Sequence, residues 1–322
     1  MASLLSVENL QVQFQTKKGI NTAVDGVSFS VEKGRILGIV GESGCGKSVT
    51  SMSILQLLGS NARISGGSIK LDGKELIGLP EKEMCRIRGN DIAMIFQDPM
   101  TALNPTLTIG TQLMEPIMLH QNCGKKEAWT RAVDVLKRVG IAAPEKRMKE
   151  YPHKLSGGMR QRVMIAMAVS CEPRLLIADE PTTALDVTIQ AQILELMCEL
   201  REKMGTAIML ITHDMGVVAE TADDVLVLYA GKAVEYGSIE DIFERPKHPY
   251  TQGLLNSIPR LDEDVELLNT IEGTVPAPDA MPAGCRFAPR CPYGKDRCMK
   301  EKPGVYHAGN SLVSCFRYEG EK

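Results

Sequence analysis

Residues 35–58 read RILGIVGESGCGKSVTSMSILQLL, a β-rich stretch followed by a glycine-rich loop and a helical pattern. The stretch Ile36–Val40 is apolar apart from one glycine, which is typical of a buried strand. Apolar residues at Met52, Leu55 and Leu58 recur at the spacing of a helix. The segment therefore predicts a strand, a loop and a helix in succession, the local unit of an α/β protein.

The loop Gly41–Ser48, called the phosphate loop below, fits the pattern G-x-x-x-x-G-K-[ST]. Glycines let backbone N–H groups wrap around a phosphate at the start of a helix. We expect Lys47 to reach the β- and γ-phosphates and Ser48 to ligate Mg²⁺. A chance match should occur in about one chain of this length in a hundred, so the motif is strong evidence but not proof. The other positions expected at the nucleotide are Glu42, Ser43, Gly44, Cys45, Gly46 and Val49.

A second buried strand is expected at Leu175–Ala178, within PRLLIADEPTTALD, and two adjacent carboxylates follow it. Parallel strands place functional groups at their carboxyl ends. We expect Asp179 to belong to the Mg²⁺ shell and Glu180 to orient or deprotonate the attacking water as a general base. An Asp-Glu pair is more often a solvated strand end, but the phosphate loop in the same chain favours the catalytic interpretation.

The tetrapeptide LSGG precedes an expected helix at Met159–Cys171. Ser156 and the two glycines would present a hydroxyl and bare N–H groups to an anion. With the motifs above, this segment resembles the signature of ATP-binding cassette (ABC) ATPases. The resemblance implies a head-to-tail dimer with two ATP molecules, in which the signature loop completes the site of the opposite subunit. The signature loop consists of Leu155, Ser156, Gly157, Gly158 and Met159.

Three further positions match this family in the expected order along the chain. Gln97, at the end of an expected strand Ile92–Phe96, matches the lid glutamine that senses Mg²⁺ and the attacking water. Asp186 matches the aspartate that contacts the partner cassette. His213, after an expected strand Ala207–Ile211, matches the switch histidine at the γ-phosphate. A lone histidine is usually a satisfied polar residue, but its place in this series favours a catalytic role.

Phe14 lies in the early strand pattern LQVQF. It matches the aromatic residue that stacks on adenine in the family. A strand phenylalanine is more often part of a hydrophobic core, and the two kinds of contact look alike in sequence. Both interpretations of Phe14 stay open.

The 322 residues, 43% of them hydrophobic, suffice for a sizeable core and two or more folding units. The resemblance implies an α/β fold of the P-loop (RecA-like) class over residues 1–255, with an antiparallel β subdomain and an α-helical subdomain. The helical subdomain is expected at about 97–160, and a small cysteine-rich extension at 256–322. Apolar residues at helical spacing mark one face of the helical subdomain: Ala128, Ala132, Val135, Leu136 and Val139.

Charge and hydropathy exclude several classes of protein. Lys and Arg number 37 against 40 Asp and Glu, a near balance without a nucleic-acid footprint. No apolar run approaches the roughly 18 residues that span a bilayer. The start, MASLLSVENLQVQF, does not read as a signal peptide. We expect a soluble chain in the cytoplasm that binds no nucleic acid.

Three segments narrow the resemblance to one branch of the family. The signature continues as LSGGMRQ, with Met159 where glutamine is commoner, the lid reads QDPMTALNP, and the cassette is followed by RPKHPYTQGLL. Together they resemble ATPase subunits of dipeptide, oligopeptide and nickel importers. The resemblance implies a subunit on the cytoplasmic face of the membrane, with two permeases, a second related ATPase and an extracytoplasmic peptide-binding protein as partners. A nickel or metallophore importer, and a soluble cassette ATPase outside transport, remain the alternatives.

Four of the nine cysteines crowd into one segment, Cys285-x5-Cys291-x6-Cys298-x16-Cys315, called the cysteine module below. The preceding residues 259–285 are rich in Pro, Asp and Glu and predict an extended strap that does not pack. The expected cytosolic location disfavours disulfides.

Three interpretations of the module stay open. Structural zinc sites usually contain a tight C-x2–4-C pair, which this spacing lacks. A [4Fe–4S] cluster takes one thiolate at each of four corners. Residues 281–322 hold eight Lys or Arg against four Asp or Glu, a surplus that would offset an anionic cluster. The resemblance implies such a cluster in some peptide-importer ATPases, so we expect [4Fe–4S], with zinc or buried free thiols as alternatives.

Overall fold

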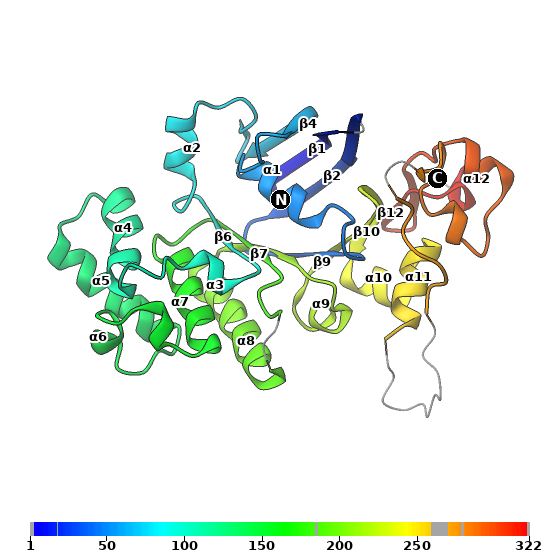
Figure 1. Ribbon diagram of the computed structural model, residues 1–322. Coiled ribbons are helices and arrows are strands. Elements are labelled where there is room, and N and C mark those ends of the chain that lie inside the picture. The colour runs from blue at the N-terminus through cyan, green and yellow to red at the C-terminus, as the bar shows by residue number, and fades with distance from the viewer. Residues whose placement is uncertain (1–2, 18, 184–185, 259–269, 278–279, 321–322) are drawn as a thin grey trace.

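The computed structural model describes residues 3–17, 19–183, 186–258, 270–277 and 280–320. In Figure 1, a central sheet lies between a helical region, from α4 (Ile109–Gln121) to α7 (Gly157–Val169), and a C-terminal region with α12 (Asp296–Lys300). A second sheet lies above the central sheet. Two hydrophobic cores cover the two faces of the central sheet. Leu176 and Ala178 point into one core, whereas Leu175 and Ile177 point into the other, as the alternation of a strand requires.

Within the described residues, the central sheet has the strand order β11-β12-β10-β9-β3-β8-β7-β6. Its parallel strands are β6 Ile92–Ile95, β7 Leu175–Asp179, β8 Ala207–Ile211, β3 Ile36–Val40 and β9 Asp224–Tyr229. Four of them, all but β9, confirm strands expected from the sequence, because strands buried on both faces give continuous apolar runs. The sheet continues with three antiparallel strands: β10 Lys232–Ser238, β12 Ser311–Val313 and β11 Tyr306–Ala308.

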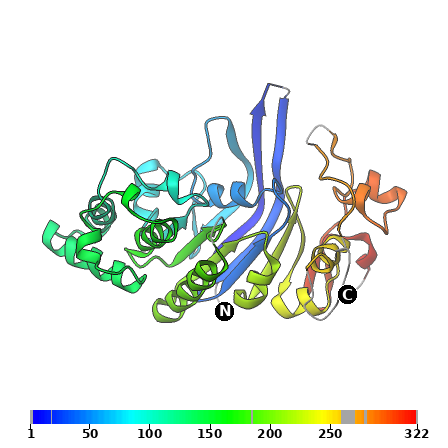
Figure 2. The ribbon, with the colours of Figure 1, turned by 60° about the horizontal axis from the view of Figure 1, so that its bottom comes forward.

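The second sheet is antiparallel and has the strand order β2-β1-β4-β5. Its strands are β1 Ser3–Thr16, β2 Gly19–Glu32, β4 Ala62–Leu71 and β5 Lys74–Glu75. Figure 2 shows β1 and β2 as a long ribbon that stands beside the helices. Val12 and Val24 face each other in this ribbon and are fully buried. The antiparallel subdomain expected from the sequence is thus present, and α2 (Glu81–Ile87) follows it.

The helical region follows β6. Its elements are α3 Pro99–Ala102, α4 Ile109–Gln121, α5 Lys125–Arg138, α6 Pro144–Arg147, the 3₁₀ turn η1 Pro152–Lys154 and α7 Gly157–Val169. The five apolar residues expected on one helix face, from Ala128 to Val139, are all buried on α5 and the residue after it, which confirms the helical period. Later helices of the chain are α8 Val187–Met204, α9 Met215–Thr221, α10 Ile239–Glu244 and α11 Pro249–Asn256.

Helix α1, Lys47–Ile54, is shorter than the apolar pattern predicts. It ends in a Schellman motif, in which the N–H of Leu57 donates to the carbonyl of Met52 at 2.8 Å. The N–H of Gln56 donates to the carbonyl of Ser53 at 3.1 Å. Gln56 has φ 50°, a left-handed conformation that glycine usually supplies at this place. No glycine marks the end of α1, so the apolar pattern predicts a longer helix than the structure contains.

The described strap residues 270–277 contain no helix or strand, as the composition predicts. The expectation that the strap does not pack is wrong, because Ile271 and Val275 contact the hydrophobic core. A Cβ on Gly253 of α11 would lie 2.8 Å from Cγ1 of Ile271, so a glycine allows this close approach. Strap residues 259–269 and 278–279 lie outside the described residues.

The cysteine module docks on the cassette through charges around Asp25 of β2. The carboxylate of Asp25 pairs with Lys232 of β10 at 3.1 Å. It also pairs with Arg286 at 3.0 Å and with Lys302 at 3.4 Å, both from the module. Burial alone would raise the pKa of Asp25, but these three cations hold it below its usual value. With β11 and β12 added to the central sheet, the module is part of the folded cassette and not a loosely attached tail.

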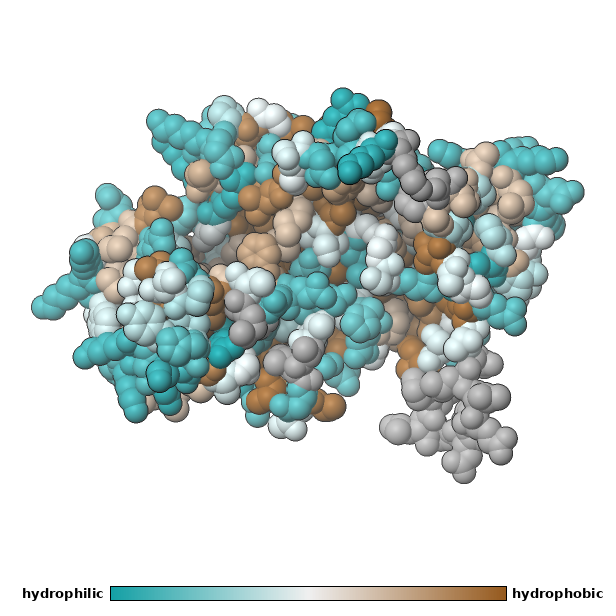
Figure 3. All heavy atoms as spheres, in the orientation of Figure 1, coloured by the Kyte–Doolittle hydropathy of each residue, from teal (hydrophilic) through white to brown (hydrophobic). Residues whose placement is uncertain are grey.

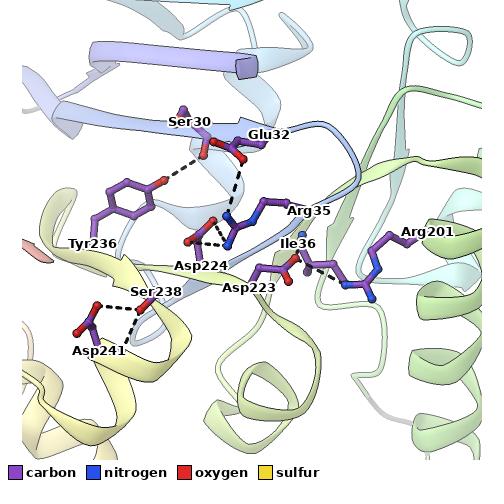
Figure 4. A network of polar contacts seen from close by, with 10 residues as sticks. All are labelled: Ser30, Glu32, Arg35, Ile36, Arg201, Asp223, Asp224, Tyr236, Ser238 and Asp241. Atoms are coloured by element: carbon purple, nitrogen blue, oxygen red, sulfur yellow. Dashed lines mark hydrogen bonds and ion pairs between the residues drawn. The ribbon is translucent and has the colours of Figure 1, made fainter. Parts of the chain in front are cut away.

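A polar network fixes the edge of the central sheet where β3 and β9 begin (Figure 4). Oδ2 of Asp223 accepts the N–H of Ile36 at 2.7 Å and lies 3.6 Å from Nη1 of Arg201. Arg35 donates to Oδ1 of Asp224 at 3.2 Å. These contacts hold the amino ends of β3 and β9 in register. The carboxyl ends of the parallel strands lie together at the opposite end of the sheet.

The surface in Figure 3 is mostly hydrophilic, and its hydrophobic residues form separate patches. In the part of the chain that the structure describes, no helix combines the length and apolar character needed to cross a bilayer.

Candidate functional site

The phosphate loop leaves the carboxyl end of β3 and leads into α1. Gly41, Gly44 and Gly46 have φ values of 149°, 77° and 100°, which side-chain-bearing residues rarely adopt. A Cβ on Gly41 would lie 2.1 Å from the carbonyl oxygen of Leu228 on β9. A Cβ on Gly46 would lie 3.0 Å from the carbonyl oxygen of Ala23. Glycine is therefore required both by the turn and by the contact with neighbouring strands.

Lys47 is the first residue of α1 and is only 6% exposed. Its Nζ donates to the carbonyl of Gly41 at 2.6 Å and to that of Glu42 at 3.2 Å. The ammonium group thus lies inside the loop, held by weak carbonyl partners that a phosphate can replace. A charged hydrogen bond to phosphate is stronger than one to a neutral carbonyl.

The remaining residues of the loop divide into an exposed and a buried set. Ser43, Gly44 and Ser48 are exposed. Cys45 is buried, and burial raises the pKa of its thiol, so this residue offers a ligand its backbone and not a thiolate. Val49 is half-buried and packs against the core below the antiparallel sheet. Of the exposed residues, Ser43 and Ser48 can meet a nucleotide with their side chains.

Asp179 at the end of β7 is 4% exposed. Burial raises the pKa of its carboxyl, while a hydrogen bond from Ser48 and the charge of Lys47 act in the opposite direction. Its Oδ1 makes no hydrogen bond to the described residues. A buried carboxylate oxygen without a partner, next to a hydroxyl, fits the oxygen ligands that Mg²⁺ prefers. The structure therefore brings Ser48 and Asp179 together as the sequence predicts.

Glu180 lies where the ends of β6, β7 and β8 meet. Its Oε2 accepts hydrogen bonds from Nε2 of Gln97 at 3.0 Å and from Oγ1 of Thr183 at 2.9 Å. Nδ1 of His213 lies 3.4 Å from Oε1. Gln97 and His213, both expected at the ATP site from the sequence, thus meet the carboxylate of Glu180. The His213 side chain is 65% exposed and Glu180 is 18% exposed, so the cluster opens toward solvent, where ATP can enter.

The backbone of Glu180 is strained. Its φ of 47° is in the left-handed region, which costs a non-glycine residue about 1–2 kcal/mol. Its N–H donates to the carbonyl of Ile211 on β8 at 2.8 Å, which holds the residue in this conformation. Strain of this kind is concentrated at functional sites because it aims a side chain.

The signature loop begins α7. Oγ of Ser156 caps the helix and accepts the N–H of Met159 at 3.3 Å, while Leu155 is buried beneath it. An open cleft of about 520 Å³ is lined by residues 156–159 and by Asp186, which caps α8 through the N–H of Ile189 at 2.9 Å. None of the described residues that line this cleft belongs to the phosphate loop.

Phe14 is half-buried near the end of β1. It pairs with Asn21 of β2 and Ala62 of β4, and its side chain contacts the core of the antiparallel sheet. This position is compatible with both interpretations drawn from the sequence. Stacking of Phe14 on adenine therefore stays a prediction.

The cysteine module contains the 3₁₀ turns η3 Ala288–Arg290 and η4 Phe316–Tyr318 and the helix α12 Asp296–Lys300. Its four cysteines line one cavity of about 80 Å³. In the part of the chain that the structure describes, no three His, Cys, Asp or Glu side chains are close enough to hold one metal ion. The four cysteines thus line a common space.

Three of these sulfurs are surrounded alike. Burial raises the pKa of Cys285 to about 11 and also raises the pKa of Cys291 and of Cys315. In each case the backbone N–H group two residues later in the chain, that of Phe287, Tyr293 or Arg317, acts to lower the pKa. Backbone N–H bonds to thiolate sulfur are one way in which proteins stabilise iron–sulfur clusters. The [4Fe–4S] cluster expected from the sequence stays a prediction.

Sequence reasoning missed three residues that contact the site. Thr183 holds Glu180, Tyr250 accepts the N–H of Glu42 at 2.9 Å, and Arg290 pairs with the carboxylate of Glu42 at 2.7 Å. The segment RPKHPYTQGLL, which contains Tyr250, indicates the branch of the family but predicts no contact with Glu42. No local sequence pattern links Tyr250 or Arg290 to Glu42. The contacts depend on how the C-terminal region packs against the central sheet.

Comparisons with known proteins agree with this geometry. Residues 24–183 match the family described as ABC transporter, and residues 234–298 match the family described as Oligopeptide/dipeptide transporter, C-terminal region. Among solved structures, the chain is similar to the dimeric, post-hydrolysis ATP-binding cassette MJ0796 bound to ADP and Pi. The TM-score is 0.66 at 27% identity, over 73% of this chain and 98% of that chain. Fold and site together define an ATP-binding cassette of the ABC transporter class, which confirms the fold class expected from the sequence.

Curated relatives match nearly the full chain. It is 56% identical to the oligopeptide transport ATP-binding protein AppD of Bacillus subtilis (strain 168), over 100% of this chain and 98% of the relative. It is 54% identical to the dipeptide transport ATP-binding protein DppD of the same strain, over 98% and 95%. Identity to the oligopeptide transport ATP-binding protein OppD of Escherichia coli (strain K12) is 52%, over 98% and 93%. The chain belongs to this family of oligopeptide and dipeptide transport ATP-binding proteins.

Proposed function

We propose that this protein is the ATP-hydrolysing subunit of an importer of oligopeptides or dipeptides. The observation that carries the proposal is the 56% identity to an oligopeptide transport ATP-binding protein over the whole chain, cysteine module included. The subunit hydrolyses ATP to drive transport. It works with two permease subunits and a substrate-binding protein, at the cytoplasmic face of the membrane.

We assign the chemical step to Glu180. One of its oxygens is occupied by hydrogen bonds from Gln97 and Thr183, which fix the carboxylate in place. The other oxygen faces His213 and the open side of the cluster, so it is the one that can take a proton from the attacking water. Gln97 orients that water, and His213 contacts the γ-phosphate. The proton leaves the water as its oxygen bonds to phosphorus, and ADP leaves from the opposite side.

The phosphate loop binds the leaving group and the transferred group. Lys47 exchanges its carbonyl partners for β- and γ-phosphate oxygens, and backbone N–H groups of residues 41–49 surround the phosphates. Ser48, Asp179 and Gln97 are the proposed ligands of Mg²⁺. When bound, Mg²⁺ would neutralise charge that develops on the phosphates.

We propose that two cassettes close head to tail around two ATP molecules. In that arrangement residues 155–159 contact the ATP held by the partner, and Asp186 contacts the partner chain. The open cleft that residues 156–159 share with Asp186 and the dimeric state of the similar cassette MJ0796 support this arrangement. The partner is a second related ATPase, or a second copy of this chain in isolation.

We propose the domain limits that the sequence suggests, an ATPase domain at 1–255 with a helical subdomain at about 97–160, and an extension at 256–322. The match to the C-terminal family begins earlier, at residue 234, and β11 and β12 join the central sheet. Phe14 is kept as the proposed adenine contact, because it is only partly buried near the end of β1.

We also propose that Cys285, Cys291, Cys298 and Cys315 bind a [4Fe–4S] cluster. The cavity that the four cysteines share and the backbone N–H groups that lower the pKa of three of the thiols support this proposal. When bound, the cluster would cross-link the four segments of the module and could exchange an electron.

Uptake of labelled peptides by the cells that encode this protein tests the main proposal. With Lys47→Ala in place of the natural chain, we expect uptake of dipeptides or of longer peptides to be lost and nickel uptake to continue. Lys82→Ala, a change of an exposed lysine on α2, is the matched control and should leave both unchanged. Loss of nickel uptake with normal peptide uptake would overturn the proposal in favour of a metal importer.

A further inference from the structure

The C-terminal region holds the phosphate loop through an ion pair between Arg290 and Glu42. Nη1 of Arg290 donates to Oε2 of Glu42 at 2.7 Å, and Nη2 donates to Oε1 at 3.0 Å. The Arg290 side chain is 6% exposed and that of Glu42 is 28% exposed. Two parallel bonds between a guanidinium and a carboxylate fix orientation as well as distance. The pair joins residues 248 positions apart in the chain.

All five N–H donors of Arg290 are used. Besides the two bonds to Glu42, its Nε donates to the carbonyl of Glu272 at 2.9 Å and Nη2 to that of Ile271 at 3.2 Å. Nη1 also donates to the hydroxyl of Tyr229 at 3.3 Å. A guanidinium offers five donors in one plane, and here each has an acceptor. Lysine, with a single ammonium group, cannot reproduce this set.

Glu42 is held from a second side by Tyr250. The hydroxyl of Tyr250 accepts the backbone N–H of Glu42 at 2.9 Å. The Tyr250 ring is fully buried and packs against Tyr229 at a centroid distance of 4.7 Å and against Phe287 at 5.4 Å. Both the backbone and the side chain of Glu42 therefore depend on residues outside the ATP-binding motifs.

The carbonyl of Glu42 faces Lys47. Nζ of Lys47 lies 3.2 Å from this carbonyl oxygen, so a rotation of the residue would shift both the lysine and the N–H groups next to it. We propose that Arg290 is a positioning residue for ATP hydrolysis, which holds Glu42 so that the phosphate loop is preformed for ATP. Because Arg290 directly precedes Cys291, this role also makes the cysteine module part of the support of the ATP site.

Loss of the pair should act on ATP binding and not on the chemical step. The contacts of Arg290 do not include Glu180, Gln97 or His213, and the loop binds phosphate in the ground state and the transition state alike. Removing uniform binding raises KM and leaves kcat unchanged. A charged hydrogen-bonded pair of this kind corresponds to an increase in KM of about 10-fold or more.

The test is a double-mutant cycle on the full chain in its assembled complex, with Arg290→Gln, Glu42→Ala and both changes together. We expect each single variant to raise the KM for ATP about 10-fold, with kcat within about twofold of the wild type. The double variant should be no worse than the worse single variant, because the two residues act as one unit. Arg290→Lys should fall between Arg290→Gln and wild type.

Arg297→Gln is the matched control. Like Arg290, Arg297 directly precedes a cysteine of the module. It pairs through both Nη atoms with a glutamate, Glu319, and its Nη2 lies 3.0 Å from Oε1. Its contacts include no residue of the phosphate loop. We expect its KM for ATP to equal that of the wild type. An equal rise in KM for Arg297→Gln, additive effects of Arg290→Gln and Glu42→Ala, or an unchanged KM for Arg290→Gln would each overturn the proposal.

Where Arg290→Gln does not fold, Arg290→Lys takes its place in the cycle with Glu42→Ala. Non-additive KM changes would again support the role, and additive changes would refute it. ATP hydrolysis alone is measured here, so the result does not depend on which peptide is imported or on what the thiols bind.

Discussion

Replacing Glu180 by glutamine should abolish ATP turnover while leaving ATP binding intact. The amide oxygen can occupy the place of Oε2, where it still accepts hydrogen bonds from Gln97 and Thr183. The amide nitrogen then takes the place of Oε1, which in the wild type lies 3.4 Å from Nδ1 of His213. Nδ1 can accept a hydrogen bond from this amide when the imidazole is protonated on Nε2. Shape and position are preserved, so the variant removes only the ability to take a proton.

The magnitude follows from that single loss. A general base contributes about 10²- to 10⁴-fold to a rate, and each factor of ten corresponds to about 1.4 kcal/mol of the activation barrier. We therefore expect Glu180→Gln to raise the barrier by about 3–5 kcal/mol. Phosphate release at saturating ATP, measured on the assembled complex, gives kcat, and titration with a fluorescent nucleotide gives the affinity.

Glu172→Gln is the matched control. Glu172 also has a left-handed backbone, with φ 55°, but pairs with Arg138 on the surface at 3.2 Å. We expect Glu172→Gln to keep wild-type turnover. This result would show that the loss of turnover in Glu180→Gln comes from losing the base, and not from removing a charge at any strained glutamate. If Glu180→Gln retained turnover within about threefold of the wild type, well below the range of a lost base, the assignment of Glu180 would be refuted.

Three further predictions concern the loop, the thiols and the docking of the module. A methyl group at Gly41 would lie 2.1 Å from the carbonyl oxygen of Leu228, so Gly41→Ala should weaken nucleotide binding at least about tenfold; unchanged binding in a titration would contradict the described loop. Protein purified without oxygen should contain about four iron and four sulfide per chain, and Cys291→Ser should lose both; zinc, or no metal, in the wild type would contradict the cluster. Asp25 is held ionised below its usual pKa of 3.8, so its contribution to the free energy of unfolding is complete above that pH and decreases as the pH falls through the lowered pKa. Urea denaturation at about pH 5 and about pH 3 should therefore show a smaller pH dependence for Asp25→Asn than for the wild type, and equal pH dependences would contradict this role.

The sequence was most informative where a short segment determines its own structure. The strands β3, β7 and β8 were predicted with their limits or within one residue because each is buried on both faces and reads as an apolar run. The parallel arrangement of such strands then places Glu180 near His213, since strand ends on one sheet edge are neighbours. For Gln97, Glu180 and His213, their proximity could be expected from the sequence alone.

The rest depends on contacts between distant segments or on locally disfavoured conformations. Gln56 adopts the left-handed conformation of a glycine, so nothing in the pattern marked the end of α1. The strands β11 and β12 span three residues each, too few to show a period, and they form because β10 offers an edge. The pair of Arg290 and Glu42 exists only after this tail has joined the sheet.

The two sides of the ATP site are therefore supported in different ways. Glu180 and its partners follow parallel strands, so the register of the central sheet sets their geometry, and a change there should alter kcat. Glu42 is supported from behind by Tyr250 and Arg290, and a change there should alter the KM for ATP. Any condition that loosens the cysteine module should thus lower the affinity for ATP before it slows hydrolysis of the ATP that remains bound. The order of these two effects can be followed in one preparation as the module is progressively destabilised. If the module supports the phosphate loop, the KM for ATP rises first. A general loss of folding would instead reduce the number of active sites without changing KM.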